Sequence, residues 1–187
     1  MLLQMQRYMA GLQEAWGRLD TAVIHQVIQI LHQARLQGQQ IFIMGNGGSA
    51  ATASHFACDL AKGTVSGSLP FFRVMALTDN VALMTAYAND QSYEHIFAGQ
   101  LANWVQPDDI VIGISTSGQS PNVLRATALA NERGATTIGL TGFDGGMLAP
   151  LVTYSVHVPC HSVGQAEDIH LMLIHVIIEA LVEIARE

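Results

Sequence analysis

The sequence predicts a doubly wound α/β protein, with helices covering both faces of a parallel sheet. Three observations support this class. Short apolar runs alternate with helical patterns along the chain. The runs are almost continuously hydrophobic, as expected of strands buried on both faces. Half of the 187 residues are apolar and 12% are charged, which suits a single domain with a full core.

The elements follow one another in a regular order. Residues 21–36 space their apolar side chains at helical intervals, and Gly38 is placed to end that helix. The later helical patterns are 49–62, 92–105, 121–133 and a long one from about 166. Gly134 follows the third of these as a stop signal. The predicted strands are 40–44, 72–77, 109–114, 136–140 and 154–158.

Charge and composition exclude several classes of partner. The net charge of −7 leaves no basic stripe to neutralise phosphates, so a nucleic-acid partner is not expected. The most apolar segment, 171–185, is interrupted by His175, Glu179 and Glu183 and therefore predicts a core helix rather than a membrane span. No apolar signal-peptide core is found near the start, and two cysteines are too few for a disulfide framework. We expect a cytoplasmic protein without membrane partners.

Residues 113–123 (GISTSGQSPNV) leave a predicted strand and enter a predicted helix through a run of hydroxyl side chains. The hydroxyls belong to Ser115, Thr116, Ser117 and Ser120. Backbone N–H groups at a helix N-terminus attract anions, and each hydroxyl can donate to a phosphate oxygen. A serine there can also simply cap the helix, with Pro121 at its first position. So many hydroxyls in one short loop favour phosphate binding.

A second strand-to-helix turn, within residues 43–56 (IMGNGGSAATASHF), is rich in glycine. It does not fit the G-x-G-x-x-G fingerprint of dinucleotide-binding folds, and it lacks the Gly-Lys-Ser/Thr of a Walker loop. Ligands of doubly wound sheets bind beyond the carboxyl ends of the strands. Both turns are therefore placed where a ligand is expected.

Groups able to transfer protons lie on two of the predicted helices. His55 and Asp59 are four residues apart and share one helix face. The last helix offers Glu167, Asp168, His170 and His175. Such residues are often structural, because a histidine can pack in a core and a carboxylate can face solvent. Burying an ionisable group without a partner is costly, so the residues alone leave catalysis and structure both open.

Taken together, GNGGSA, SHFA, ISTSGQSPNV and LTGFDGG resemble the sugar isomerase (SIS) domain, particularly the phosphoheptose isomerase family, over nearly the whole chain. The resemblance implies a flavodoxin-like fold with a five-stranded parallel sheet. It implies a single SIS domain over 1–187 with an N-terminal helical extension, assembled as a homo-oligomer, expected to be a tetramer. The implied reaction is aldose–ketose isomerisation through an enediol, with sedoheptulose 7-phosphate as the expected substrate and glycero-manno-heptose 7-phosphate as the product.

The resemblance also implies roles for individual residues. Asp59 would be the base and His175 the acid. The sugar phosphate would be held by Ser115, Thr116, Ser117 and Ser120. Further substrate contacts are implied for Asn46, Gly47, Ser49, Asn89, Asp90 and Gln165. Members of the family can bind zinc, and the matching positions are His55, Asp59, Glu167 and His175, a reasonable zinc set.

The chain departs from the family pattern at several of these places. Asp59 is one methylene shorter than the usual glutamate, and Glu167 stands where glutamine is usual. Lys62 and Gly63 replace an expected arginine, and Gly164 replaces an expected aspartate. The general chemistry survives these changes, which bear on the identity of the substrate.

Two other functions are compatible with the same motifs. One is a non-catalytic phosphosugar-binding SIS module that acts through protein partners, as in the DnaA initiator-associating type. That type lacks the histidine equivalent to His175, which this chain keeps, so an enzyme is favoured. The other is a phosphosugar-sensing regulator, but no DNA-binding domain accompanies the module here.

Overall fold

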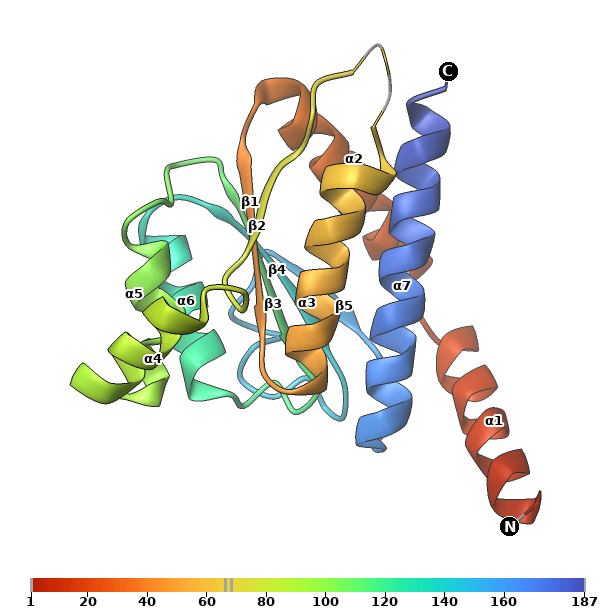
Figure 1. The fold of residues 1–187 in the computed structure, drawn as a ribbon. Helices are drawn as coiled ribbons and strands as arrows, with labels where there is room; N and C mark the ends of the chain where they lie inside the picture. Colours follow the sequence, from red (N-terminus) through yellow and green to blue (C-terminus); the bar gives the residue numbers. More distant parts are fainter. Residues whose placement is uncertain (1, 66, 68, 187) are drawn as a thin grey trace.

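The computed structural model, which describes residues 2–65, 67 and 69–186, has a five-stranded sheet between two layers of helices (Figure 1). All neighbouring strands are parallel, and their order is β2-β1-β3-β4-β5. This order confirms the predicted flavodoxin-like, doubly wound fold. The strands are β1 (Gln40–Gly45), β2 (Arg73–Ala76), β3 (Ile110–Ser115), β4 (Thr136–Thr141) and β5 (Tyr154–His157).

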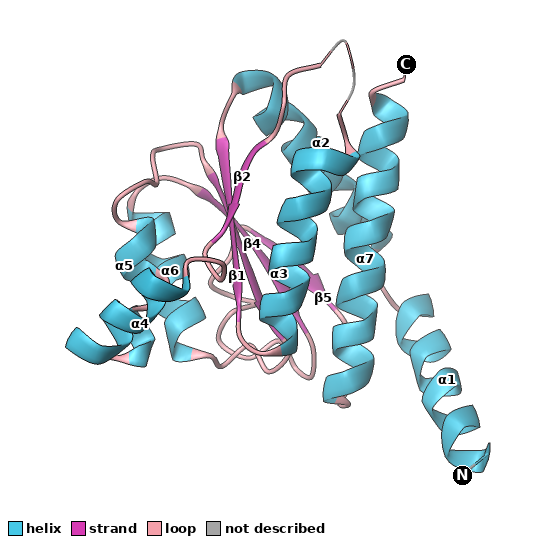
Figure 2. Cartoon of the chain, viewed as in Figure 1, coloured by secondary structure: helices cyan, strands magenta, loops and turns pink. Residues whose placement is uncertain are grey.

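Helices cover both faces of this sheet (Figure 2). One layer contains α2 (Thr21–Gln37), α3 (Gly48–Cys58) and α7 (Val163–Ile184). The other contains α4 (Val81–Asp90), α5 (Ala98–Leu101) and α6 (Pro121–Glu132). The first helix, α1 (Leu2–Gly17), projects from the body beside the start of α7 (Figure 1). Among the described residues, no helix combines the length and hydropathy needed to cross a bilayer.

The apolar runs of the strands divide between two cores. Ile41 and Ile43 of β1 pack into the core beneath α2, α3 and α7. Phe42 and Met44, which alternate with them, pack into the core beneath α4 to α6. Because both faces of the strand are buried, nearly every position must be apolar, as the unbroken hydrophobic runs predicted.

Residues at the ends of α2 and α6 fix where these helices begin and end. The Asp20 carboxylate accepts hydrogen bonds from the N–H groups of Ala22 and Val23, which fixes the start of α2. Gly38 ends α2 in the left-handed conformation with φ 70°, and Gly134 follows α6 with φ 77°.

The structure corrects several boundaries. The helix predicted at 92–105 is wrong in extent, since the segment contains a 3₁₀ turn, Tyr93–His95, and the four-residue α5. Three consecutive apolar residues there, 96–98, are all buried, and no single helix face can bury three in a row. The predicted helix 49–62 divides into α3 and a π-helical turn, Asp59–Gly63, and α7 begins at Val163, earlier than predicted.

Candidate active site

The serine loop (residues 115–120) connects β3 to α6 at the point where the strand order reverses. Ser120 occupies the N-cap position of α6, but its side chain makes no capping hydrogen bond. Its Oγ lies instead 3.1 Å from Oγ of Ser115, while Ser117 Oγ accepts from the N–H of Gln119 at 3.2 Å. Capping therefore does not account for the Ser120 hydroxyl, which pairs with Ser115 beside a helix N-terminus.

Backbone hydrogen bonds from residues 142–148 hold the serine loop in place. The N–H of Gly142 donates to the carbonyl of Thr116 at 2.8 Å, and the N–H of Leu148 donates to that of Gly118 at 3.0 Å. Gly118 has φ 63°, and a Cβ atom on it would lie 2.1 Å from the carbonyl oxygen of Gly145. Only glycine is compatible with both constraints. The loop is thus held in a fixed shape by the protein itself.

The glycine loop (residues 45–49) leads from β1 into α3. Gly47 has φ 56°, and Ser49 is buried in the first turn of the helix. A Cβ atom on Gly48 would lie 2.6 Å from each carboxylate oxygen of Glu167. The bare backbone therefore lets the Glu167 carboxylate reach the N-terminus of α3, where the helix dipole favours negative charge.

A pair of side-chain amides joins the glycine loop to the start of α6, the helix that follows the serine loop. Asn46, in the glycine loop, and Asn122, in the first turn of α6, exchange hydrogen bonds of 2.9 and 2.8 Å. The Tyr93 hydroxyl lies 3.0 Å from Oδ1 of Asn46. Sequence reasoning assigned no role to Asn122 or Tyr93. Asn122 is buried, and a buried amide requires partners.

A second cluster lies where α3 packs against α7. His55 Nε2 is 3.2 Å from Asp59 Oδ2, and the rings of His55 and His175 meet edge to face with centroids 5.0 Å apart. Asp59 opens the π-helical turn that follows α3, a type of distortion frequent at functional sites. The side chains of His55 and Asp59 are 44% and 28% exposed, so the cluster is open to a ligand.

The donor set of this cluster suits a zinc ion. One ligand atom from each of His55, Asp59 and His175 lies within 4.8 Å of the others. Two imidazole nitrogens and one carboxylate oxygen, with a position left for substrate or water, make a catalytic type of zinc site. Among the described residues, Glu167 is not part of this group. It precedes His175 by eight positions on α7, or about 12 Å along the helix axis.

The other predicted substrate contacts have different surroundings. Asn89 and Asp90 are the last two residues of α4, are exposed, and hydrogen-bond to each other at 2.9 Å. The Gln165 amide donates to the backbone carbonyl of Tyr8 at 2.8 Å and accepts from the Cys160 thiol at 3.2 Å. Within one chain, Gln165 therefore fastens α1 to the start of α7.

The Tyr8 hydroxyl strengthens the same contact between α1 and α7. It donates to Asp168 Oδ2 at 2.6 Å, and this hydrogen bond raises the pKa of Tyr8 to about 12. Asp168, one of the acidic candidates on the last helix, is thereby engaged with α1 rather than with the histidine–aspartate cluster.

His170 is structural in this fold. It is completely buried, with Nε2 3.2 Å from the carbonyl oxygen of Thr141. Burial lowers its pKa to about 4, although the hydrogen bond to Thr141 acts in the opposite direction. A neutral imidazole held against a backbone carbonyl packs α7 onto the sheet.

The glycine and serine loops at the carboxyl edge of this sheet, with the histidine–aspartate cluster, define a protein of the SIS class. The family model for the SIS domain matches residues 5–142. A phosphoheptose isomerase of Geotalea daltonii is 38% identical over 168 residues, covering 90% of this chain and 87% of the relative. Structures of phosphoheptose isomerases from Neisseria gonorrhoeae and Francisella tularensis match with TM-scores of 0.87, at 31% and 28% identity, over 96% of this chain and 95% of each of theirs. The chain belongs to the phosphoheptose isomerase family, as its motifs predicted.

Proposed function

We propose that this protein isomerises sedoheptulose 7-phosphate to glycero-manno-heptose 7-phosphate. One observation carries the proposal: the fold unites Asp59 and His175 in one open cluster, and the same chain presents a braced, hydroxyl-rich loop at a helix N-terminus. The first arrangement supplies a base and an acid, and the second supplies a site for a phosphate group. The names of the relatives support the same reaction.

The proposed chemistry moves one carbon-bound proton. Asp59 takes a proton from C1 of the ketose while protonated His175 donates one to the oxygen on C2, which gives an enediol. Asp59 then returns its proton to C2, and His175 takes the hydroxyl proton from the oxygen on C1, which leaves an aldehyde. His55 holds Oδ2 of Asp59, so that Oδ1 is the oxygen we assign to proton transfer.

Zinc is the proposed cofactor of this cluster, held by His55, Asp59 and His175. When bound, the ion supplies a positive charge that stabilises negative charge on substrate oxygens. Glu167 is the fourth ligand that the family pattern proposes, although in this chain its carboxylate lies at the N-terminus of α3, and the residue itself lies about 12 Å along α7 from His175.

We further propose that the working enzyme is a homotetramer whose sites combine residues of different subunits. Asp59 lies about 15 Å along the helix direction from Ser49, at the opposite end of α3 from the loops. Met172 and Val176, which flank His175 on α7, are 42% and 41% exposed. Apolar side chains beside a catalytic group favour cover by another subunit. In this assembly α1 is an N-terminal extension of a single SIS domain spanning 1–187.

A cytoplasmic location is part of the proposal. Cys58 and Cys160 are both free, as is usual in a reducing compartment.

The test is direct. Purified protein is incubated with a panel of ketose phosphates that includes sedoheptulose 7-phosphate, and products are identified by NMR. We expect conversion of the seven-carbon substrate. Binding without conversion of any member of the panel would instead support a non-catalytic phosphosugar-binding module.

A further inference from the structure

The side-chain amides of Asn46 and Asn122 have a single possible orientation. The backbone N–H of Val123 lies 2.9 Å from Oδ1 of Asn122, and a backbone N–H can only donate. The atom facing it must therefore be the oxygen of Asn122. The Nδ2 group of Asn122 then donates to Oδ1 of Asn46, and Asn122 Oδ1 accepts in return from Asn46 Nδ2.

The same accounting fixes the hydroxyl of Tyr93. Oδ1 of Asn46 accepts from Asn122, so the Tyr93 hydroxyl, 3.0 Å from that oxygen, donates as well. Both lone pairs of Asn46 Oδ1 are then used. Among the described residues, Asn46 Nδ2 has one partner, which leaves its second N–H available to a ligand.

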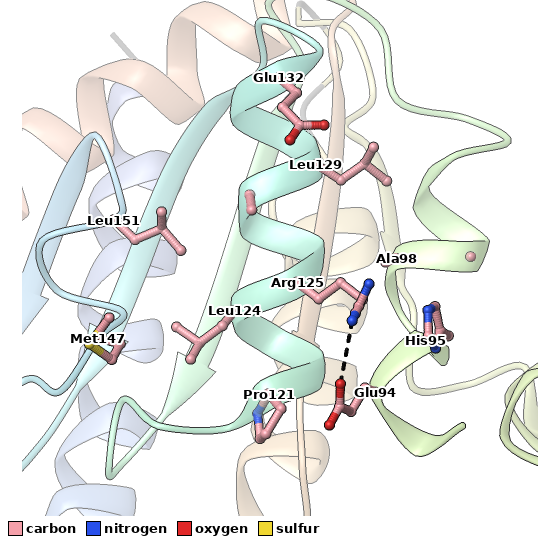
Figure 3. Close-up of a pocket in the computed structure, with 12 residues that line it drawn as sticks. Glu94, His95, Ala98, Pro121, Leu124, Arg125, Leu129, Glu132, Met147 and Leu151 are labelled. Atoms are coloured by element: carbon pink, nitrogen blue, oxygen red, sulfur yellow. Dashed lines mark hydrogen bonds and ion pairs between the residues drawn. The ribbon is translucent and has the colours of Figure 1, made fainter. Parts of the chain in front are cut away.

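Tyr93 is itself held in place by its neighbours. Glu94, the next residue of the 3₁₀ turn, points toward Arg125 of α6, with 3.4 Å between Oε2 of Glu94 and Nη2 of Arg125 (Figure 3). Ser92 Oγ lies 2.9 Å from His95 Nδ1 and accepts from the N–H of Glu94. The turn that carries Tyr93 is thus attached to the helix that carries Asn122.

We propose that Asn122 is a positioning residue for substrate recognition, and that Tyr93 assists it. Together they saturate the oxygen of Asn46, so that Asn46 presents an N–H donor to the sugar and not an acceptor. The recognised group is then an oxygen of the sugar chain, a hydroxyl or the carbonyl. This inference rests on the proposed function, because it assigns Asn46 to the sugar.

The location of Asn122 explains why its loss should affect sugar binding without affecting phosphate binding. It is 1% exposed and lies two residues after Ser120, in the first turn of the helix that begins at the serine loop. Its side-chain hydrogen bonds, within the part of the chain that the structure describes, go to Asn46 and to the N–H of Val123, and none goes to the serine loop. Loss of the amide should therefore disturb the contact with the sugar and leave the phosphate contacts intact.

The experiment compares three variants with the parent protein by steady-state isomerisation of sedoheptulose 7-phosphate. Asn122→Ala removes the positioning amide, and Tyr93→Phe removes only the second donor to Asn46. Asn131→Ala is the matched control: this α6 asparagine donates to the carbonyl of Leu151 and accepts from Thr137, away from both loops. Each protein is also inhibited with inorganic phosphate, and its melting temperature is measured.

For Asn122→Ala we expect KM to rise about tenfold, which corresponds to the loss of one hydrogen bond to the sugar. For Tyr93→Phe we expect KM to rise severalfold. The inhibition constant of inorganic phosphate should stay unchanged in both, and Asn131→Ala should alter neither quantity. If Asn122→Ala matches Asn131→Ala in KM, the inference is wrong. If Asn122→Ala does not fold, the exposed Tyr93→Phe decides, and an unchanged KM there overturns it. An inactive parent would overturn the proposed function together with the inference.

Discussion

Asp59, in the π-helical turn after α3, and His175, in α7, are more than a hundred residues apart in the sequence, yet a carboxylate oxygen of one lies within 4.8 Å of a ring nitrogen of the other. The packing of α3 against α7 creates this relationship. Since His55 contacts both residues, the cluster can hold a proton in transit or a metal ion. Proton transfer and metal binding by this cluster can be measured separately.

The serine loop should contribute a large part of substrate affinity. The double substitution Ser115→Ala with Ser120→Ala removes the paired hydroxyls, at about 1–2 kcal/mol for each charge-assisted hydrogen bond. We expect calorimetry to show phosphosugar binding weaker by at least tenfold. Ser155→Ala, on β5, is the control and should bind like the parent. Equal affinity of the double variant and the control would show that the loop does not hold the phosphate.

Zinc binding should depend on the cluster. The parent should bind one zinc ion per chain, measured by metal analysis and competition with a chelator. Mutating a residue that only hydrogen-bonds to a metal ligand commonly lowers metal affinity by about 10–100-fold. His55→Ala and His175→Ala each remove a ligand itself, so we expect each to lower zinc affinity by more than that. His25→Ala removes an exposed histidine of α2 and should change nothing. Unaltered zinc affinity in both cluster variants would place the ion elsewhere.

Assembly should depend on the exposed face of α7. Charges introduced by Met172→Glu and Val176→Glu oppose burial of that face against another subunit. Light scattering at micromolar concentration should show a tetramer for the parent and a smaller species for the double variant, with activity reduced in parallel. Val81→Glu introduces a charge on exposed α4 as the control. A monomeric parent would contradict the proposed assembly.

Buried His170 should make stability fall on acidification. Its pKa is about 4 in the folded protein against a usual 6.5, so the unfolded chain takes up the proton first as pH falls. The contribution of neutral His170 to the free energy of unfolding is complete above pH 6.5. It is lost progressively as the pH falls toward 4, and the loss is about 3 kcal/mol at most. Urea unfolding at fixed protein concentration should therefore show a shallower loss between pH 6.5 and 4.5 for His170→Gln. Parallel curves for variant and parent would refute this role.

Much of the fold could be predicted because its causes are local. The strands are buried on both faces and must be apolar throughout, and Asp20 and Gly38 mark the ends of α2. The segment 92–105 was mispredicted because its burial is set by tertiary contacts. One example is the Tyr87 ring, which lies so close to Gly99 that a Cβ there would approach within 2.4 Å.

The site could be predicted only where spacing or family pattern sufficed. Four-residue spacing placed His55 beside Asp59, and the family pattern added His175. Glu167 lies outside the cluster because an eight-residue separation on one helix spans more than two turns. Asn122 was missed because its role depends on an amide from a different loop, which no local pattern contains.

In the proposed mechanism, Asp59 and His175 transfer the substrate proton. This transfer is measured as incorporation of deuterium from heavy water into the sugar phosphate, followed by NMR for the parent, Asp59→Asn and His175→Gln. We expect exchange by the parent and a decrease of about 10²–10⁴-fold in each variant, with the inhibition constant of inorganic phosphate unchanged. Exchange at the parental rate in both variants would contradict it and leave the two residues a structural role.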